Sequence, residues 1–265
     1  MSSKVRLYVD HPLGAGQTVP LDRDQAHYLF GVMRMGAGDG LSLFNGRDGE
    51  WHAEVAEAGK RGGSLRAVAQ TRPLALPPDL WLLFAPIKKA RTDFIVEKAA
   101  EMGARRICPV QTDFTNSDRI RQDRLQAHAV EAAEQCGGTF VPSVEGLEKL
   151  GALLDRWPAE RRLMFCDEAR VGQAVPDVAG PSGAQGGAGD GPWAILIGPE
   201  GGFSPAERER LHALPQAKVV SLGPRILRAD TAAVAAMTLW QLRHGDWQAD
   251  GEPSGQGPTA PGGRP

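Results

Sequence analysis

The chain has 265 residues, a length that favours two domains of unequal size. Of these residues 42% are hydrophobic, and the formal net charge is −2. The near-neutral charge argues against a protein that coats nucleic acid through bulk electrostatics, and no apolar run approaches the roughly 20 residues that span a bilayer. The three cysteines form no CxxC pair, and the six histidines show no metal-ligand spacing. We therefore expect a cytoplasmic protein with reduced cysteines, no membrane segment and no bound metal.

Residues 1–72 predict a small β-rich domain. Alternating apolar residues indicate half-buried strands in VRLYV, GLSLFNG, EWHAEVAEA and SLRAVAQ, and DRDQAHYLFGVMR between the first two predicts one helix. Pro73, Pro77 and Pro78 mark the expected boundary to a second, larger domain over residues 73–248.

Beyond these prolines the pattern changes to strands that alternate with helices. The segments LWLLFA, RRICPV and RLMFCDE predict strands, and helices are expected over residues 92–102, 123–136 and about 147–157. Such alternation favours an α/β fold with a mostly parallel sheet covered on both faces. Residues 172–192 and 249–265 contain mostly Gly, Ala, Pro and Ser, so we expect a flexible insertion and a disordered tail.

Two glycine-containing turns in the carboxyl-terminal third each join a predicted strand to a predicted helix. In ILIGPEGGFSPAE, three glycines in five residues follow an apolar strand, and Ser204 is placed to cap a helix. In LGPRILRADTAA, Gly223 ends a strand over residues 218–222, and Asp230 or Thr231 is expected to cap a long helix. If the two strands are parallel neighbours, both turns open at the carboxyl edge of the sheet, where α/β proteins bind ligands.

The spacing of the first turn limits the kind of ligand. GPEGG has neither the GxGxxG spacing of a dinucleotide site nor the GxxxxGK[ST] spacing of a phosphate loop. Its bare backbone instead lets a flat ligand lie directly against peptide groups. One such turn is often a plain connection between a strand and a helix, whereas two together favour a binding site.

The motifs IGPEGGFSPAE and LGPRILRADTA resemble the two carboxyl-terminal motifs of the RsmE-type 16S ribosomal RNA uridine N3-methyltransferases, which belong to the trefoil-knotted SPOUT class. Three further segments also resemble motifs of this family. In chain order they are HYLFGVMRMGAGD, KKARTDFIVEKAAEMGARRICPV and EAAEQCGG. The resemblance implies a carboxyl-terminal trefoil-knotted domain and an amino-terminal PUA-like RNA-binding domain. It also implies a homodimer that methylates 16S ribosomal RNA, free or in the small ribosomal subunit.

The resemblance further implies that S-adenosylmethionine binds at the two turns, through main-chain groups and apolar side chains. The expected contacts are Ile197, Gly198, Gly201, Gly202, Leu222, Gly223, Ile226 and Leu227. Methylation at N3 of uracil requires that the N3 proton leaves and that the developing charge is stabilised. We expect Arg228 to bind the uracil carbonyl oxygens and Glu200 to accept the proton, or alternatively to stabilise the loop.

RNA contacts are expected in both domains. N3 lies on the Watson–Crick edge, so the target must be unpaired or flipped out while the enzyme holds the flanking RNA. The candidate contacts are Arg6, Tyr28 and Arg34 in the first domain and Lys88, Lys89 and Arg91 in the second. The loop over residues 112–117 reads TDFTNS where many relatives have a Glu, Arg, Ser run.

The helix after the second turn is the expected dimer face, through Val234, Met237, Leu239 and Trp240. Three other functions remain open: a ribose 2′-O-methyltransferase of the same fold, a non-catalytic RNA-binding assembly factor, and a nucleotide-dependent oxidoreductase. The intact glycines disfavour the assembly factor, and the spacing of GPEGG disfavours the oxidoreductase.

Overall fold

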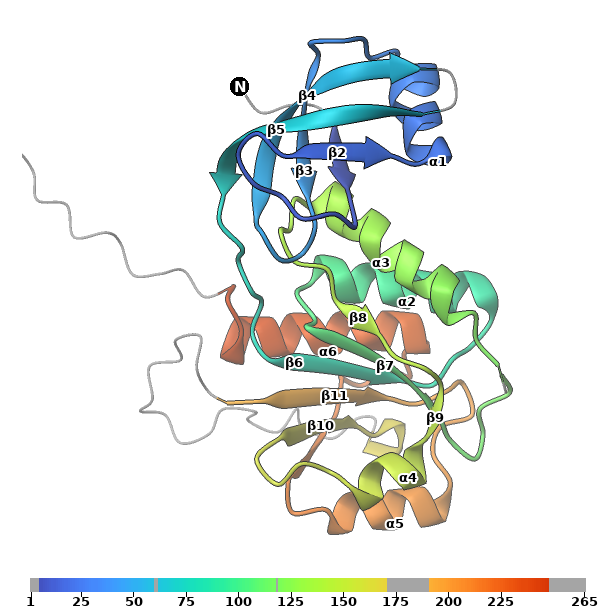
Figure 1. Ribbon diagram of the computed structural model, residues 1–265. Helices are drawn as coiled ribbons and strands as arrows, with labels where there is room; N and C mark the ends of the chain where they lie inside the picture. The colour runs from blue at the N-terminus through green and yellow to red at the C-terminus, as the bar shows by residue number, and fades with distance from the viewer. Residues whose placement is uncertain (1–4, 60–61, 118, 171–190, 248–265) are drawn as a thin grey trace, which may run out of the picture.

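The computed structural model contains two β-sheets that follow one another along the chain (Figure 1). It describes residues 5–59, 62–117, 119–170 and 191–247. The predicted tail and all but the last two residues of the predicted insertion lie outside the described residues. In the part that is described, no helix is long and apolar enough to cross a membrane.

The first sheet has five strands in the order β1-β3-β4-β5-β2. Its strands are β1 (Arg6–Tyr8), β2 (Thr18–Leu21), β3 (Gly40–Phe44), β4 (Glu50–Gly59) and β5 (Gly62–Arg72). The predicted helix is present as α1 (Arg23–Ala26), continued by a π-helical turn (His27–Val32). β2 was not predicted, because its four residues include Pro20, which suits an edge strand but weakens a strand signal.

The second sheet is parallel and runs in the order β12-β10-β11-β6-β7-β8. Its strands are β6 (Leu80–Phe84), β7 (Arg106–Gln111), β8 (Ser143–Val144), β10 (Arg162–Cys166), β11 (Trp193–Ile197) and β12 (Ala217–Val220), with β9 (Glu148–Lys149) paired to β7 alone. The prediction of a mostly parallel α/β sheet is confirmed. β11 and β12 run parallel, but they are not direct neighbours, because β10 lies between them.

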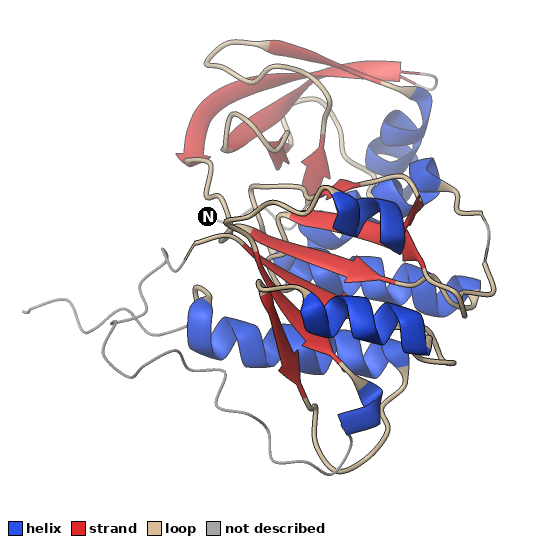
Figure 2. Cartoon of the chain, turned by 90° about the horizontal axis from the view of Figure 1, so that it is seen from below, coloured by secondary structure: helices blue, strands red, loops and turns tan. Residues whose placement is uncertain are grey.

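Helices cover both faces of this sheet (Figures 1 and 2). One face packs against α2 (Lys89–Glu101), α3 (Gln122–Cys136) and α6 (Ala229–His244). The other face packs against α4 (Leu150–Asp155) and α5 (Pro205–Ala213). Because the strands are parallel, the loops that follow them meet at the carboxyl-terminal edge of the sheet. The trefoil knot stays a prediction.

The predicted N-cap of α5 is confirmed, and the predicted N-cap of α6 is wrong. Ser204 caps α5, accepting a hydrogen bond from the Glu207 amide, while the Glu207 side chain accepts one from the Ser204 amide. The expected cap of α6 at Asp230 or Thr231 is wrong. That helix begins at Ala229, so Asp230 lies in its first turn, where a carboxylate favours the helix dipole.

The prediction that α6 forms a dimer face is also wrong for Met237 and Trp240. Met237 and Trp240 are buried against the sheet in the main hydrophobic core, and Val234 and Leu239 pack partly against the same core. The inward stripe continues through Ala233, at the spacing of one helical face. These residues therefore attach the helix to its own sheet.

Arg6 connects the first sheet to α3 in the second domain. Its guanidinium donates to Glu50 at 2.8 Å and to the carbonyl oxygens of Ala133, Glu134 and Gly138 at 2.8 to 2.9 Å. Its side chain is only 16% exposed. In place of the predicted RNA contact, the structure assigns Arg6 to the junction between the two sheets.

Glu50 is the anion of this junction, and its titration predicts a pH-dependent stability. Burial favours its neutral form, but hydrogen bonds from Arg72, Arg6 and Thr71 outweigh burial and lower the pKa of Glu50. A carboxylate with a lowered folded pKa stabilises the protein above its unfolded pKa of about 4.3. That stabilisation is lost as the pH falls through the folded value.

We expect Glu50→Gln to lower the free energy of unfolding by about 3 kcal/mol at neutral pH, because two arginines lose their shared anion. The difference from wild type should shrink below about pH 4. Urea unfolding across this range measures it. The control Glu54→Gln removes an exposed pair with Arg66 and should cost less than about 1 kcal/mol. A pH-independent loss in Glu50→Gln would contradict the assignment.

Candidate functional site

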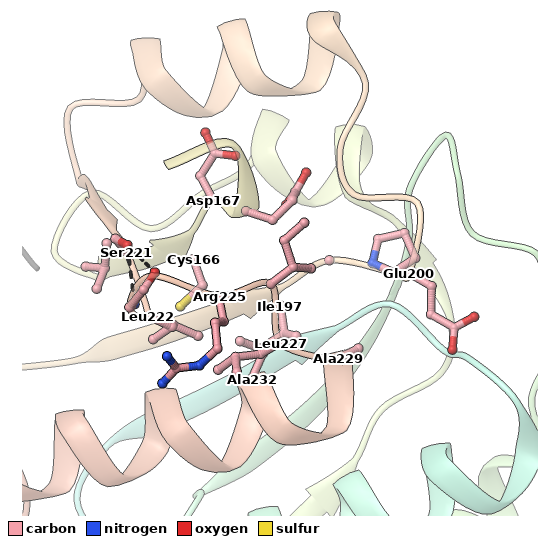
Figure 3. Close-up of a pocket in the computed structure, with 16 residues that line it drawn as sticks. Cys166, Asp167, Ile197, Glu200, Ser221, Leu222, Arg225, Leu227, Ala229 and Ala232 are labelled. Atoms are coloured by element: carbon pink, nitrogen blue, oxygen red, sulfur yellow. Dashed lines mark hydrogen bonds between the residues drawn. The ribbon is translucent and has the colours of Figure 1, made fainter. Parts of the chain in front are cut away.

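A pocket lies at the carboxyl ends of β10, β11 and β12 (Figure 3). The turn after β11 and the turn after β12 form its two sides, so the two predicted turns do meet at one site. Cys166, the last residue of β10, also lines the pocket, as do Asp167 and Glu168, which follow that strand. Sequence reasoning missed these three residues because the place of β10 between β11 and β12 is a long-range property.

Most of the expected cofactor residues line this pocket. They are Ile197, Gly198, Leu222, Gly223, Ile226 and Leu227. Neither Gly201 nor Gly202 does. Gly202 has a φ of +71°, and an added Cβ there would overlap the Glu168 carboxylate, while one on Gly201 would come within 3.2 Å of the Cβ of Phe114. These two glycines shape the turn into α5.

Gly198 and Gly223 are needed for different physical reasons. A Cβ on Gly198 would lie 2.6 Å from the buried ring of Phe203, so this glycine provides space. Nothing lies within 4 Å of a Cβ on Gly223, but its φ of +112° is one that other residues rarely adopt. The second turn therefore leaves bare backbone beside an open space.

One wall of the pocket carries acidic groups that α5 holds in place. Asp167, whose side chain is 2% exposed, accepts a hydrogen bond from Nε of Arg208 at 3.2 Å. Glu168 pairs with the same arginine and accepts from the amide of Phe203 at 3.3 Å. Burial raises the pKa of the neighbouring Cys166 thiol to about 12, so that side chain is an uncharged part of the lining. Asp167 is thus buried and paired, and of the two carboxylates only Glu168, whose side chain is 32% exposed, has accessible oxygen beside an apolar floor.

Glu200 lines the pocket (Figure 3). Its carboxylate is held by Arg91. Nη1 of Arg91 lies 2.7 Å from a carboxylate oxygen of Glu200, and its Nε lies 3.6 Å from Asp230 at the start of α6. Arg91 therefore links α2, the turn after β11 and α6. Lys88 and Lys89, at the start of α2, are exposed and have no ion-pair partner in the described part of the chain.

Two arginines follow the second turn, and only one lines the pocket. Arg225 is among the lining residues, and sequence reasoning missed it. Arg228, the predicted catalytic arginine, is the exposed N-cap residue of α6. Its chain neighbours Leu227 and Ala229 line the pocket, but Arg228 itself does not. Within the residues that the structure covers, its guanidinium has no hydrogen-bond or ion-pair partner.

The two remaining RNA candidates are exposed on the first domain. Tyr28 lies in the π-helical turn with 38% of its surface exposed, and Arg34 follows that turn with a φ of +57°. Their contact with RNA stays a prediction. Across the described ranges, no group of three His, Cys, Asp or Glu side chains is arranged to hold a metal ion.

The two kinds of glycine predict different mutational behaviour. Gly198→Ala should destabilise the protein by about 1 to 3 kcal/mol through overpacking, and combining it with Phe203→Leu should recover part of this loss. Gly223→Ala should cost about 1 to 2 kcal/mol through backbone strain, with no coupling to Phe203→Leu. Thermal unfolding of the single and double variants measures both couplings. Equal coupling in the two cycles would contradict this assignment.

Comparison with known families and structures supplies the chemical class. A family model described as an RNA methyltransferase domain matches residues 75–241, and one described as an RNA methyltransferase PUA domain matches residues 21–67. The ribosomal RNA small subunit methyltransferase E of Rickettsia conorii is 30% identical over 238 residues, which cover 89% of this chain and 95% of that protein.

Two solved structures share the fold. A ribosomal RNA small subunit methyltransferase E from Neisseria gonorrhoeae, bound to S-adenosyl methionine, superposes with a TM-score of 0.80 at 27% identity, covering 92% of this chain and 99% of that one. A putative methyltransferase from Legionella pneumophila, also with this cofactor, gives a TM-score of 0.80 at 26% identity, covering 91% and 98%.

These matches span both sheets, and the larger one contains the whole pocket. The first domain is therefore a PUA-type domain, and the second is an RNA methyltransferase domain. The similarity to the Rickettsia conorii protein extends over nearly its full length. The chain accordingly belongs to the ribosomal RNA small subunit methyltransferase E family.

Proposed function

We propose that this protein transfers a methyl group from S-adenosylmethionine to N3 of a uridine in 16S ribosomal RNA. The observation that carries the proposal is the pocket at the ends of β10, β11 and β12, in a chain of this family. Related proteins from Neisseria gonorrhoeae and Legionella pneumophila were crystallised with the same cofactor. The small ribosomal subunit or its free RNA is the proposed substrate.

The pocket residues fit this cofactor. Gly223 leaves bare backbone beside open space, and Ile226, which is 77% exposed, offers an apolar face to a flat ring. Glu168, whose side chain is 32% exposed and held by Arg208, is an acceptor that suits hydroxyl and amino groups. When bound, the cofactor supplies a methyl group on a positively charged sulfur, and carboxylates in the lining favour a cation electrostatically.

Glu200 is the proposed acceptor of the uracil N3 proton, directly or through one water. A proton acceptor must be held within hydrogen-bond reach of the group it deprotonates. Its pairing with Arg91 restrains the carboxylate at the pocket, which makes Arg91 a positioning residue. Arg228, whose guanidinium is free among the described residues, is proposed to bind the uracil carbonyl oxygens and stabilise the developing anion.

Lys88, Lys89, Tyr28 and Arg34 are proposed to hold the RNA around the target. The two lysines lie at the same sheet edge as the pocket, and all four side chains are exposed. We further propose that the protein is cytoplasmic, and that it acts as a homodimer whose interface is not the sheet-facing side of α6.

The reaction is tested with small ribosomal subunits from cells that lack this methylation. Wild-type protein with S-adenosylmethionine should produce N3-methyluridine, identified by mass spectrometry of the digested RNA. A 2′-O-methylated nucleoside would instead support the ribose methyltransferase. Absence of any methylated product, with retained RNA binding, would support the assembly factor.

Glu200→Gln should lower kcat at least about 100-fold if the carboxylate accepts the proton, with little change in affinity for S-adenosylmethionine. Glu209→Gln is the control, because that glutamate is exposed on α5, away from the pocket lining. Single-turnover methylation and calorimetry measure the two quantities. If Glu200→Gln keeps wild-type kcat, Glu200 serves only to stabilise the loop.

Replacing both Lys88 and Lys89 by Ala should weaken RNA binding and reduce the slope of log affinity against log salt by about 2, one for each lost phosphate contact. Filter binding at several salt concentrations measures the slope. Lys98→Ala is the matched control, since Lys98 is paired with Glu101 along α2. An unchanged slope in the double variant would remove these lysines from the RNA interface.

A further inference from the structure

Phe114 is a partly exposed aromatic residue that lies against the glycine turn of the pocket. It lies in the turn between β7 and α3, and 46% of its surface is exposed. Single exposed aromatics are common on protein surfaces and need no explanation by themselves. Phe114, however, lies against Gly201, where an added Cβ would approach its Cβ to 3.2 Å and its Cγ to 3.7 Å. Its neighbour is thus the residue that follows Glu200.

The turn that carries Phe114 is held closed by hydrogen bonds within itself. The amide of Thr115 donates to the carbonyl oxygen of Thr112 at 3.1 Å, and the amide of Thr112 donates to the hydroxyl of Thr115 at 2.9 Å. The two hydroxyl groups lie 2.8 Å apart. The backbone on each side of Phe114 is therefore restrained.

The same turn is also attached to the start of α5. The amide of Asp113 donates to Glu207 at 2.9 Å, and the hydroxyl of Ser204 donates to the carboxylate of Asp113 at 2.5 Å. Ser204 and Glu207 form the capping box of α5, directly after the GPEGG turn. One network therefore fixes the turn that bears Glu200 and the turn that bears Phe114 relative to each other.

Such an arrangement suits a stacking surface. An unpaired base whose Watson–Crick edge is accessible has lost neighbours in the RNA, and proteins replace them with aromatic rings. A ring on a restrained backbone loses little entropy on binding, which raises the affinity that stacking can supply. The cations near the pocket can hold phosphate but offer no aromatic face.

We propose that Phe114 is the surface on which this enzyme stacks the target uracil beside Glu200. The inference rests on the proposed function and deepens it, because it assigns a residue that selects a planar base. The glycine at position 201 is then required as well, since a larger side chain would displace the Phe114 side chain.

Steady-state methylation of undermethylated small ribosomal subunits tests the role of the ring. Phe114→Ala and Phe114→Leu should each lower kcat/KM at least about fivefold, whereas Phe114→Tyr should stay near wild type. Calorimetric affinity for S-adenosylmethionine should be unchanged in all three. Trp247→Ala is the matched control, because Trp247 is 45% exposed and follows the far end of α6. Full activity of Phe114→Leu would overturn the proposal, since leucine supplies bulk without an aromatic face.

A fluorescence experiment tests stacking independently of turnover. Phe114→Trp should show quenching by oligouridylate beyond that of wild type, which contains six tryptophans, and none by an abasic oligomer of equal length and charge. Equal quenching by both oligomers, or none, would overturn the stacking role. If wild-type protein makes no N3-methyluridine, the proposed function fails. If it does and Phe114→Ala is fully active, only the stacking proposal fails.

Discussion

The functional site depends on the register of three parallel strands. Cys166, the last residue of β10, pairs with Ile197 of β11 on one side and with Val220 of β12 on the other. The three strands therefore end at the same level of the sheet, and the chain leaves each of them at one edge. Because parallel neighbours share a direction, turns that are far apart in the sequence are brought together at that edge. The pocket follows from this register.

Helices on both faces convert these loops into a restrained site. On one face, Arg91 in α2 ties the turn after β11 to the first turn of α6. On the other, Arg208 in α5 holds the two carboxylates that follow β10. The capping box of α5 adds the turn after β7 to the same frame. The charged groups around the pocket are thereby held by contacts within the protein itself.

Much of this fold follows from local sequence patterns. Apolar runs and Gly or Ser at helix ends predicted β6, β7, β10, β11 and β12, the end of α3 at Cys136 and the cap of α5. The two-residue strands β8 and β9 were not predicted, and β9 falls where a helix was expected. Patterns of this kind depend on neighbours in the chain. The strand β2 escaped because it is short and contains a proline.

The failures concern contacts between distant residues. Periodicity cannot reveal that β10 lies between β11 and β12, so its carboxylates were missed. The charge of Arg6 gave no sign that its partners lie on α3, more than 120 residues away. The apolar face of α6 was predicted as an interface, but Met237 and Trp240 pack on the protein's own sheet. An apolar helix face shows that burial occurs, but not against which surface.

Hydrogen–deuterium exchange with and without S-adenosylmethionine tests the central claim most directly, because it reports where the cofactor orders the backbone. Exchange should slow at the ends of all three strands, in residues 166–168, 198–203 and 221–228, and stay unchanged in the first sheet. Protection confined to another region, or absent from the two glycine turns, would contradict the account.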